Sequence, residues 1–291
     1  MVRYMPLIIF ISLSIAQDMQ IRYARVHSMD IKVIGSIETT TDQTTAPGFF
    51  ITNIKFDAPR MLGFMEKETG TIMIEGKDHI LKYDAKDEEY WLVSPEDHFA
   101  PDTNSNFKIK SSNRRRSGDT DFFHFLKDDF PNPQIKRIEG DALETVNGYR
   151  ARKWTTTISG EKLELVIEEW IADEIPLLDI FDSLRIDISG ALNPYKDKKD
   201  FIKFKFSSDT FIEKADSNST IEPLNGRIIK AKLDKIGPYI KSMNFEIREL
   251  YAVPFDSLSF SIPEDYEQIK AASMPSWISR MDPSGLPSPN E

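Results

Sequence analysis

The stretch Val146–Ile171, VNGYRARKWTTTISGEKLELVIEEWI, decides the fold class of this 291-residue chain. In its second half, Leu163, Leu165 and Ile167 fall on one side of an extended chain, and Glu164 and Glu168 fall on the other. A period of two is typical of a strand with one buried and one solvated face. The Asn147-Gly148 pair near its start is a strong signal for a tight hairpin turn. The stretch therefore predicts antiparallel strands separated by short turns.

The same period recurs from Gln17 to about Tyr266. Turn-forming Gly, Asp and Asn residues separate the segments at short spacing, which favours a meandering antiparallel sheet over a parallel one. We therefore predict a mainly β fold. Its expected strands include Phe49–Asp57, Thr71–Gly76, His79–Asp84, Glu89–Ser94, Ile135–Glu139, Tyr149–Ile158, Glu161–Ile171, Phe201–Phe206, Arg227–Lys235 and Met243–Val253.

Two segments have the apolar spacing of helices. From position 177, apolar residues recur at i, i+4, i+7 and i+11, which predicts a helix over Pro176–Gly190. Phe122–Leu126 follows Asp121, a candidate N-cap, and predicts a second helix. We expect both helices to pack on the sheet as lids or as part of the core.

The composition excludes several classes of function. The chain has 47 acidic and 37 basic residues, a net charge of −10 and no cysteine. General nucleic-acid binding needs an excess of Lys and Arg, and disulfide scaffolds, thiolate metal sites and cysteine nucleophiles need cysteine. The four histidines are dispersed, and no phosphate loop, dinucleotide motif or serine elbow occurs. We predict no metal and no cofactor, and we keep an enzyme with two facing carboxylates as a third hypothesis only.

The chain begins with the features of a secretory signal peptide. Arg3 precedes the apolar run Tyr4–Ala16, which is shorter than the roughly twenty residues that a membrane-spanning helix needs. We expect cleavage near Ala16-Gln17, a periplasmic or extracellular location and no stable membrane insertion. Residues 17–270 are expected to form one β domain with a polar, mobile loop at 101–119. Residues 271–291 are rich in Pro and Ser and are expected to be disordered.

Aromatic and aliphatic side chains are the candidate ligand-binding residues. Trp154 and Trp170 lie in predicted strands, and Phe181 and Leu184 lie on the predicted helix. If the sheet curls beneath a loosely packed helix, these four side chains would line a cavity for an apolar ligand. The alternative, in which they belong to an ordinary filled core, is the commoner outcome for such residues.

A second candidate contact lies in the polar loop. Arg114, Arg115 and Arg116 form a run of guanidinium groups that suits phosphate or an anionic lipid head group. A run of charges in a loop is more often only a solvated surface. Both interpretations agree with the net acidic chain.

Five short motifs resemble the lipoprotein-carrier (LolA/LolB-like) superfamily, and in particular its exported branches. Val146–Trp154 is similar to a V-x-G-x-x-A-x-x-W/Y strand entry in that superfamily, and a second strand ending in tryptophan follows before a helix that starts Ile-Pro-Leu-Leu. The other similar segments are Asp84–Trp91, Pro223–Arg227 and Phe260–Tyr266, the last with Asp265 where the family has glycine.

This resemblance implies an antiparallel sheet curved into an incomplete barrel, with a few helices covering the concave face. It also implies a non-enzymatic carrier whose concave space receives an acyl chain of a lipid or lipoprotein. We therefore expect an exported binding protein for an apolar or acyl-chain ligand. The alternative is an envelope module that senses or binds a protein partner and has a filled core without a ligand.

Overall fold

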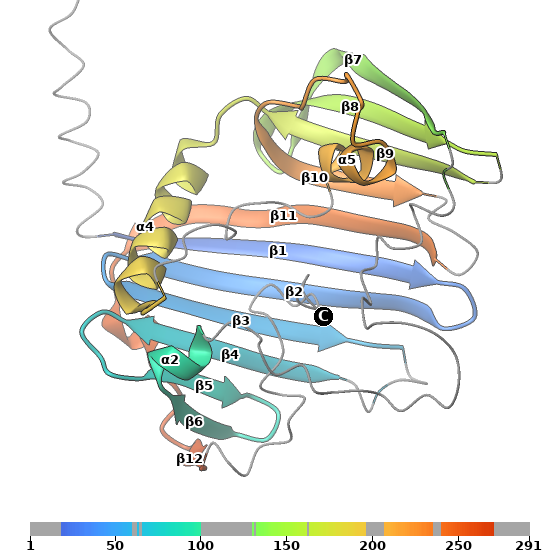
Figure 1. Cartoon of the computed structure of the whole chain (residues 1–291). Coiled ribbons are helices and arrows are strands. Elements are labelled where there is room, and N and C mark those ends of the chain that lie inside the picture. Colours follow the sequence, from blue (N-terminus) through green and yellow to red (C-terminus); the bar gives the residue numbers. More distant parts are fainter. Residues whose placement is uncertain are drawn as a thin grey trace, which may run out of the picture.

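Twelve strands pair into one open sheet in the computed structural model of the chain (Figure 1). The structure describes residues 19–59, 63, 66–99, 130, 132–161, 163–195, 207–234 and 240–270. Three α-helices and one 3-10 helix accompany the strands within these residues, so the prediction of a mainly β fold is confirmed. The elements are β1 (Met19–Ile31), β2 (Gly35–Ala46), β3 (Phe49–Asp57), β4 (Lys67–Ile74), β5 (Ile80–Asp84), β6 (Glu89–Val93), α2 (Pro95–His98), β7 (Gln134–Val146), β8 (Tyr149–Ser159), β9 (Glu164–Ala172), α4 (Pro176–Leu192), α5 (Ser208–Ala215), β10 (Arg227–Asp234), β11 (Ile240–Pro254), η2 (Ser257–Phe260) and β12 (Glu267–Gln268).

The strand order consists of two meanders joined at the first strand. It runs β12-β6-β5-β4-β3-β2-β1-β11-β10-β9-β8-β7, and neighbours are antiparallel except for the parallel pair of β12 and β6. Strand β1 pairs with β2 on one side and with β11 on the other. The N-terminal and C-terminal halves of the chain therefore meet in the middle of the sheet.

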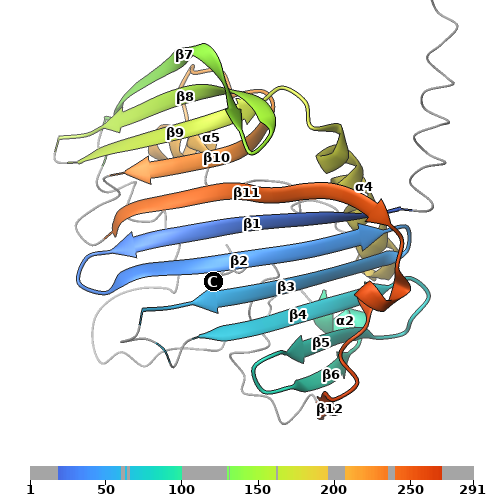
Figure 2. The ribbon, with the colours of Figure 1, turned by 180° about the vertical axis from the view of Figure 1, so that it is seen from behind.

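All three α-helices lie on one side of the sheet, which we call the helix side; the other is the back side. Helices α2, α4 and α5 stand in front of the strands in Figure 1 and behind them in Figure 2. Helix α4 crosses the strands and contacts β2, β3, β4 and β11. The ring of Tyr23 in β1 lies 5.1 Å from that of Phe181 in α4, which identifies the residues of β1 that face the helix side.

The C-terminal segment covers part of the back side (Figure 2). Phe260 of η2 is 3 % exposed and belongs to a small apolar cluster with Ala46, Ile72 and Tyr83. This cluster is separate from the main core on the helix side. The C-terminal segment thus shields apolar side chains that would otherwise face water on the back side.

The hairpin of β7 and β8 turns toward β11. Asn147 and Gly148 have φ angles of 51° and 84°, as a tight turn with two left-handed residues requires. The side-chain amide of Asn147 donates to the carbonyl of Ile247, and the Tyr149 hydroxyl donates to the carbonyl of Leu250 at 3.3 Å. Because β9 and β10 lie between β8 and β11, these bonds show that this part of the sheet curls.

The predicted segments that lie within the described residues match observed elements. The segment Phe49–Asp57 coincides with β3, and the helix predicted over Pro176–Gly190 is α4. Helix α5 was not predicted. The strand at Phe201–Phe206, the helix after Asp121, the loop at 101–119 and both expected terminal segments lie outside the described residues. In the part of the chain that the structure describes, none of the helices has the length and apolar character needed to cross a membrane.

Gly226 is required by the close approach of two strands at the start of β10. Its φ is 116°, and a Cβ atom there would lie 2.5 Å from the carbonyl oxygen of Ala172. Both the backbone conformation and the contact exclude a side chain.

We predict that Gly226→Ala lowers the free energy of unfolding by about 2–3 kcal/mol, because the strand pair must separate to admit a methyl group. Chemical denaturation measures this loss. Gly190→Ala in α4 is the control, since nothing lies within 4 Å of its added Cβ and alanine favours helix. Equal stability of the two variants would contradict the prediction.

Candidate functional site

A row of polar side chains crosses the helix side of the sheet. The strand registers place one residue from each of six neighbouring strands side by side. At a strand spacing of about 4.8 Å the row is about 24 Å long. We call it the polar row, and its members are Tyr23, Gln43, Thr52, Thr71, Lys82 and Trp91.

Five of the six members of the polar row are buried, Lys82 is partly exposed, and part of the hydrogen-bonding capacity of the row is unused. Thr52 is 1 % exposed and Trp91 is 2 % exposed. Among the described residues, the Thr52 hydroxyl and the Trp91 indole nitrogen have no hydrogen-bond partner, and neither has the buried hydroxyl of Thr41 beside the row. Leaving such groups unpaired costs about 1–3 kcal/mol each. Proteins rarely accept this cost without a structural or functional reason.

Lys82 is the charged member of the polar row. Burial lowers the pKa of its ammonium group, and no neighbouring carboxylate opposes that shift. Asp84, two residues along β5, is engaged by Lys67, with 3.4 Å between Lys67 Nζ and Asp84 Oδ2. Lys82 therefore stands on the helix side without an ion pair among the described residues.

His98 ends helix α2 close to Lys82. Burial, with a further contribution from the charge of Lys82, lowers the pKa of His98 to about 3. The imidazole is therefore neutral near pH 7, and its Nδ1 atom is buried without a hydrogen-bond partner within the described part of the chain. Lys82 and Trp91 are cross-strand partners, and His98 ends the helix that directly follows the strand of Trp91.

Apolar side chains flank the polar row beneath α4. Ile21, Phe50 and Met73 are each at most 4 % exposed and belong to the main core. They come from β1, β3 and β4, two residues along each strand from the polar row. The helix side thus presents an apolar band directly beside a polar one.

Helix α4 packs on this surface through the predicted stripe. Phe181 is 1 % exposed against Tyr23, and Leu184 is partly buried against the main core. The helix has 17 residues, which corresponds to a length of about 25 Å and so to about five strand spacings. The helix is therefore long enough to cover the apolar band from β11 to β4.

A charged clamp holds the N-terminal part of α4 to the sheet. Arg227, the first residue of β10, donates from Nε to Asp179 Oδ1 at 3.0 Å, and its Nη2 lies 2.9 Å from Asp182 Oδ2. Asp182 also pairs with Arg185 at 3.3 Å. These ion pairs raise the pKa of Arg227 above its ordinary value although partial burial opposes the shift. The clamp thus joins α4 to the first residue of β10 by an electrostatic contact.

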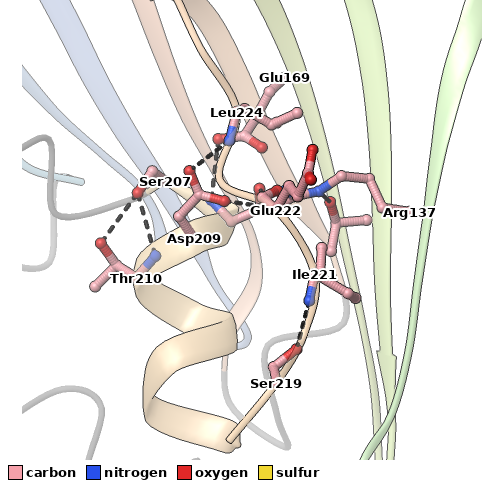
Figure 3. Close-up of polar contacts among 11 residues, drawn as sticks. Arg137, Glu169, Ser207, Asp209, Thr210, Ser219, Ile221, Glu222 and Leu224 are labelled. Carbon is pink, nitrogen blue, oxygen red and sulfur yellow. Dashed lines mark hydrogen bonds and ion pairs between the residues drawn. The ribbon is translucent and has the colours of Figure 1, made fainter. Parts of the chain in front are cut away.

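A buried network around Arg137 fixes α5 to the sheet (Figure 3). Arg137 of β7 donates to Thr156 Oγ1, Ser208 Oγ, Asp209 Oδ1 and the carbonyl of Glu222, at distances of 2.6–3.1 Å. Asp209 in turn accepts from the backbone amide of Leu224 at 3.0 Å. The guanidinium thus ties together two strands, the first turn of α5 and the segment before β10.

Glu169 completes this network from β9. Its Oε1 accepts from the backbone amide of Ser208 at 2.9 Å, while its buried Oε2 has no partner. Burial raises the pKa of Glu169. Glu169 and Asp209 both lie beside Arg137, but Asp209 is held by hydrogen bonds on both oxygens and Glu169 on one, so the pair acts here as a helix anchor.

The two predicted tryptophans lie on opposite sides of the sheet. Trp154 pairs with Glu169, so it faces the helix side, whereas Trp170 pairs with Lys153 and faces the back side. The indole of Trp170 donates to Glu144 at 2.8 Å, and the Nζ atoms of Lys153 and Lys230 lie 5.0 and 5.1 Å from its ring centroid. The two side chains therefore do not line one surface.

Arg114, Arg115 and Arg116 lie outside the described residues. The polar row was missed because its members are single residues on six strands, and only the pairing registers align them. The sequence signal that existed was weak: Thr39–Thr45 in β2 has the length of a strand but no apolar alternation. Among the described residues no group of three or more His, Asp or Glu is arranged to hold a metal ion.

Several solved structures align with most of this chain at low similarity. A crystal structure titled a putative outer membrane lipoprotein-sorting protein domain from Vibrio parahaemolyticus shares 11 % identity at a TM-score of 0.27, over 88 % of this chain and 95 % of its own. A LolA superfamily protein from Nitrosomonas europaea shares 6 % sequence identity at a TM-score of 0.24, and the alignment covers 84 % of this chain and 90 % of that protein. The structure of PNGF-II shares 8 % sequence identity at a TM-score of 0.27, and the alignment covers 90 % of this chain but only 33 % of PNGF-II.

One of these structures is named as a LolA superfamily protein, and another as a putative lipoprotein-sorting protein domain. No protein-family model and no curated protein matches the chain. Structural likeness at these TM-scores does not decide function.

We predict that Lys82→Met raises the free energy of unfolding by about 1 kcal/mol, because it removes a desolvated ammonium group that no carboxylate neutralises. Lys77→Met is the matched control, since it removes the same charge from the exposed turn before β5. Thermal denaturation of both variants measures the difference. A loss of stability in Lys82→Met would contradict the interpretation.

We predict a pH-dependent gain from Glu169→Gln. The pKa of Glu169 is raised in the folded state, so its protonated form stabilises the protein below the ordinary value of 4.5, and this contribution is lost as the pH rises through the folded pKa. The amide keeps an acceptor for Ser208. The stability of the variant relative to the natural protein should therefore increase as the pH rises from about 4.5 toward neutral.

Melting temperatures across this range measure the gain. Glu168→Gln is the control, since the neighbouring carboxylate lies on the back side and pairs with Lys153 at 2.5 Å. A difference between the natural protein and Glu169→Gln that stays constant with pH would refute the prediction.

Proposed function

We propose that the protein is an exported, non-enzymatic binding protein that holds an apolar or acyl-chain ligand between α4 and the helix side of the sheet. The observation that carries this proposal is the buried surface beneath α4, where an apolar band from Ile21 to Met73 adjoins a polar row with unpaired donors. A ligand with a chain and a polar end would match both. A lipid, or the acyl chain of a lipoprotein, has this chemistry.

Helix α4 is proposed as the lid of this site. Part of its contact with the sheet is apolar, through Phe181 and Leu184, and an apolar contact can be exchanged for a contact with an acyl chain at little cost. Phe181 and Leu184 would then face the ligand, or close the surface when none is bound. The clamp at Arg227 holds one end of the helix, which favours a hinged opening over full detachment.

Export is proposed from the sequence. The apolar run Tyr4–Ala16 and the absence of cysteine suit a chain that folds outside the cytoplasm without disulfides. The alternative function, a module for binding or sensing an envelope protein, would need a helix side that stays closed. The tight packing of Phe181 against Tyr23 is the feature that favours it.

Native mass spectrometry of the gently purified protein tests the proposal. We expect a co-purified species of lipid mass that is released by organic solvent, together with a change in tryptophan fluorescence on titration with a fatty acid. Absence of both would reject the ligand and favour the protein-interaction module.

We predict that Arg227→Met loosens α4 while the sheet stays folded. Loss of the clamp to Asp179 and Asp182 removes about 1 kcal/mol, so amide hydrogen exchange in α4 should become about fivefold faster. Exchange of a bound fatty acid should accelerate in parallel.

Arg152→Met is the control, because Arg152 pairs with Glu139 at an exposed position of β8 away from α4. Hydrogen exchange followed by mass spectrometry gives the rate for each segment. Unchanged exchange in α4 would show that the clamp does not hold the helix.

A further inference from the structure

We infer that Lys82, Trp91 and His98 form a subsite for the anionic head of the ligand, a carboxylate or a phosphate group. This inference rests on the proposed function, because it assigns one end of the same ligand. The subsite lies where β5, β6 and α2 meet, at the edge of the region that α4 covers. The subsite would orient the ligand along the polar row, with its head group at β5 and β6 and its acyl chain extending toward α4.

The strand register brings the first two groups together. Lys82 and Trp91 are cross-strand partners, so their Cβ atoms are about 5 Å apart on the same side of the sheet. His98 ends the helix that directly follows β6, and its Nδ1 atom is buried without a hydrogen-bond partner among the described residues. The three side chains thus come from one hairpin and the helix directly after it.

The subsite offers mainly hydrogen-bond donors, and its one side-chain acceptor is the second ring nitrogen of the neutral His98. A lysine ammonium and a tryptophan indole can only donate hydrogen bonds, and a neutral histidine has one N–H. The Trp91 nitrogen is buried without a partner, in a side chain that is 2 % exposed. No carboxylate of the described residues pairs with Lys82, since Asp84 is held by Lys67. An oxyanion would satisfy these donors, whereas a cation or an apolar group would not.

The surroundings favour an amphiphile over a small anion. Ile80 and Met73, on the helix side next to Lys82 and Thr71, are at most 4 % exposed. They lead to Phe50 and, through the main core, to Phe181 of α4. A head group at Lys82 would therefore leave its chain along an apolar path of about 19 Å across four strand spacings.

The test compares ligands that differ only at the head. Oleate and oleyl alcohol, each below its critical micelle concentration, are titrated into the full chain by calorimetry, and inorganic phosphate is titrated separately. We expect the natural protein to prefer oleate over the alcohol by about tenfold, the range of a charge-assisted bond. Lys82→Met should remove this preference by weakening oleate alone, and Lys77→Met should keep it.

Trp91→Phe should retain the ring but lose the N–H, and so lose about three- to tenfold in oleate affinity with no change for the alcohol. Equal affinity of the natural protein for oleate and the alcohol would overturn the subsite while leaving the proposed function in place. So would a Lys82→Met variant that loses both ligands equally.

Two results separate the subsite from the proposed function. Binding of phosphate that depends on Lys82, without binding of either chain compound, would reject the acyl ligand and keep an anion site. No binding of any of the three probes would reject both.

Discussion

The pairing of β1 with β11 is the constraint on which the rest of the structure depends. It joins residues more than two hundred positions apart and is the place where the two meanders become one sheet. Without it, the two meanders β1–β6 and β7–β11 would each expose a long unpaired edge, at β1 and at β11. Helix α4 reinforces the connection between the two meanders. It follows β9 of the C-terminal meander in the chain and packs on β2, β3 and β4 of the N-terminal meander. Contacts of such sequence separation form late and slowly in folding.

The same joint creates the surface on which the functional argument rests. The polar row starts at Tyr23 in β1 and extends through five more strands of the N-terminal meander, while its cover, α4, comes from the C-terminal half. A site assembled from both halves exists only in the folded sheet. The clamp at Arg227 also depends on the pairing of strands. Gly226 allows β10 to approach β9 closely, and this places Arg227 beside Asp182 of α4.

The sequence predicted what depends on neighbours along the chain. The alternation of apolar and polar residues predicted β3, and the spacing of apolar residues after Pro176 predicted α4. The pair Asn147-Gly148 predicted a tight turn, and both residues have left-handed backbone conformations. It did not predict which residues of different strands stand side by side. Trp154 and Trp170 each suit a buried strand position, but a register that pairs Trp154 with Glu169 sends Trp170 to the opposite side. Helix α5 was missed because its eight residues include only two large apolar side chains, and its position depends on Arg137 from a distant strand.

Two buried polar groupings on the helix side show how differently such groups can be used. Around Arg137 nearly every donor meets an acceptor, so the network fixes α5 and leaves little capacity for a ligand. Along the polar row, hydroxyl and indole groups are buried without partners, and an ammonium group has no counter-ion, among the residues that the structure describes. A core selected for stability alone would replace these residues with apolar ones at similar volume. Their retention under a helix held by a charged clamp is best explained if something from outside the chain completes them.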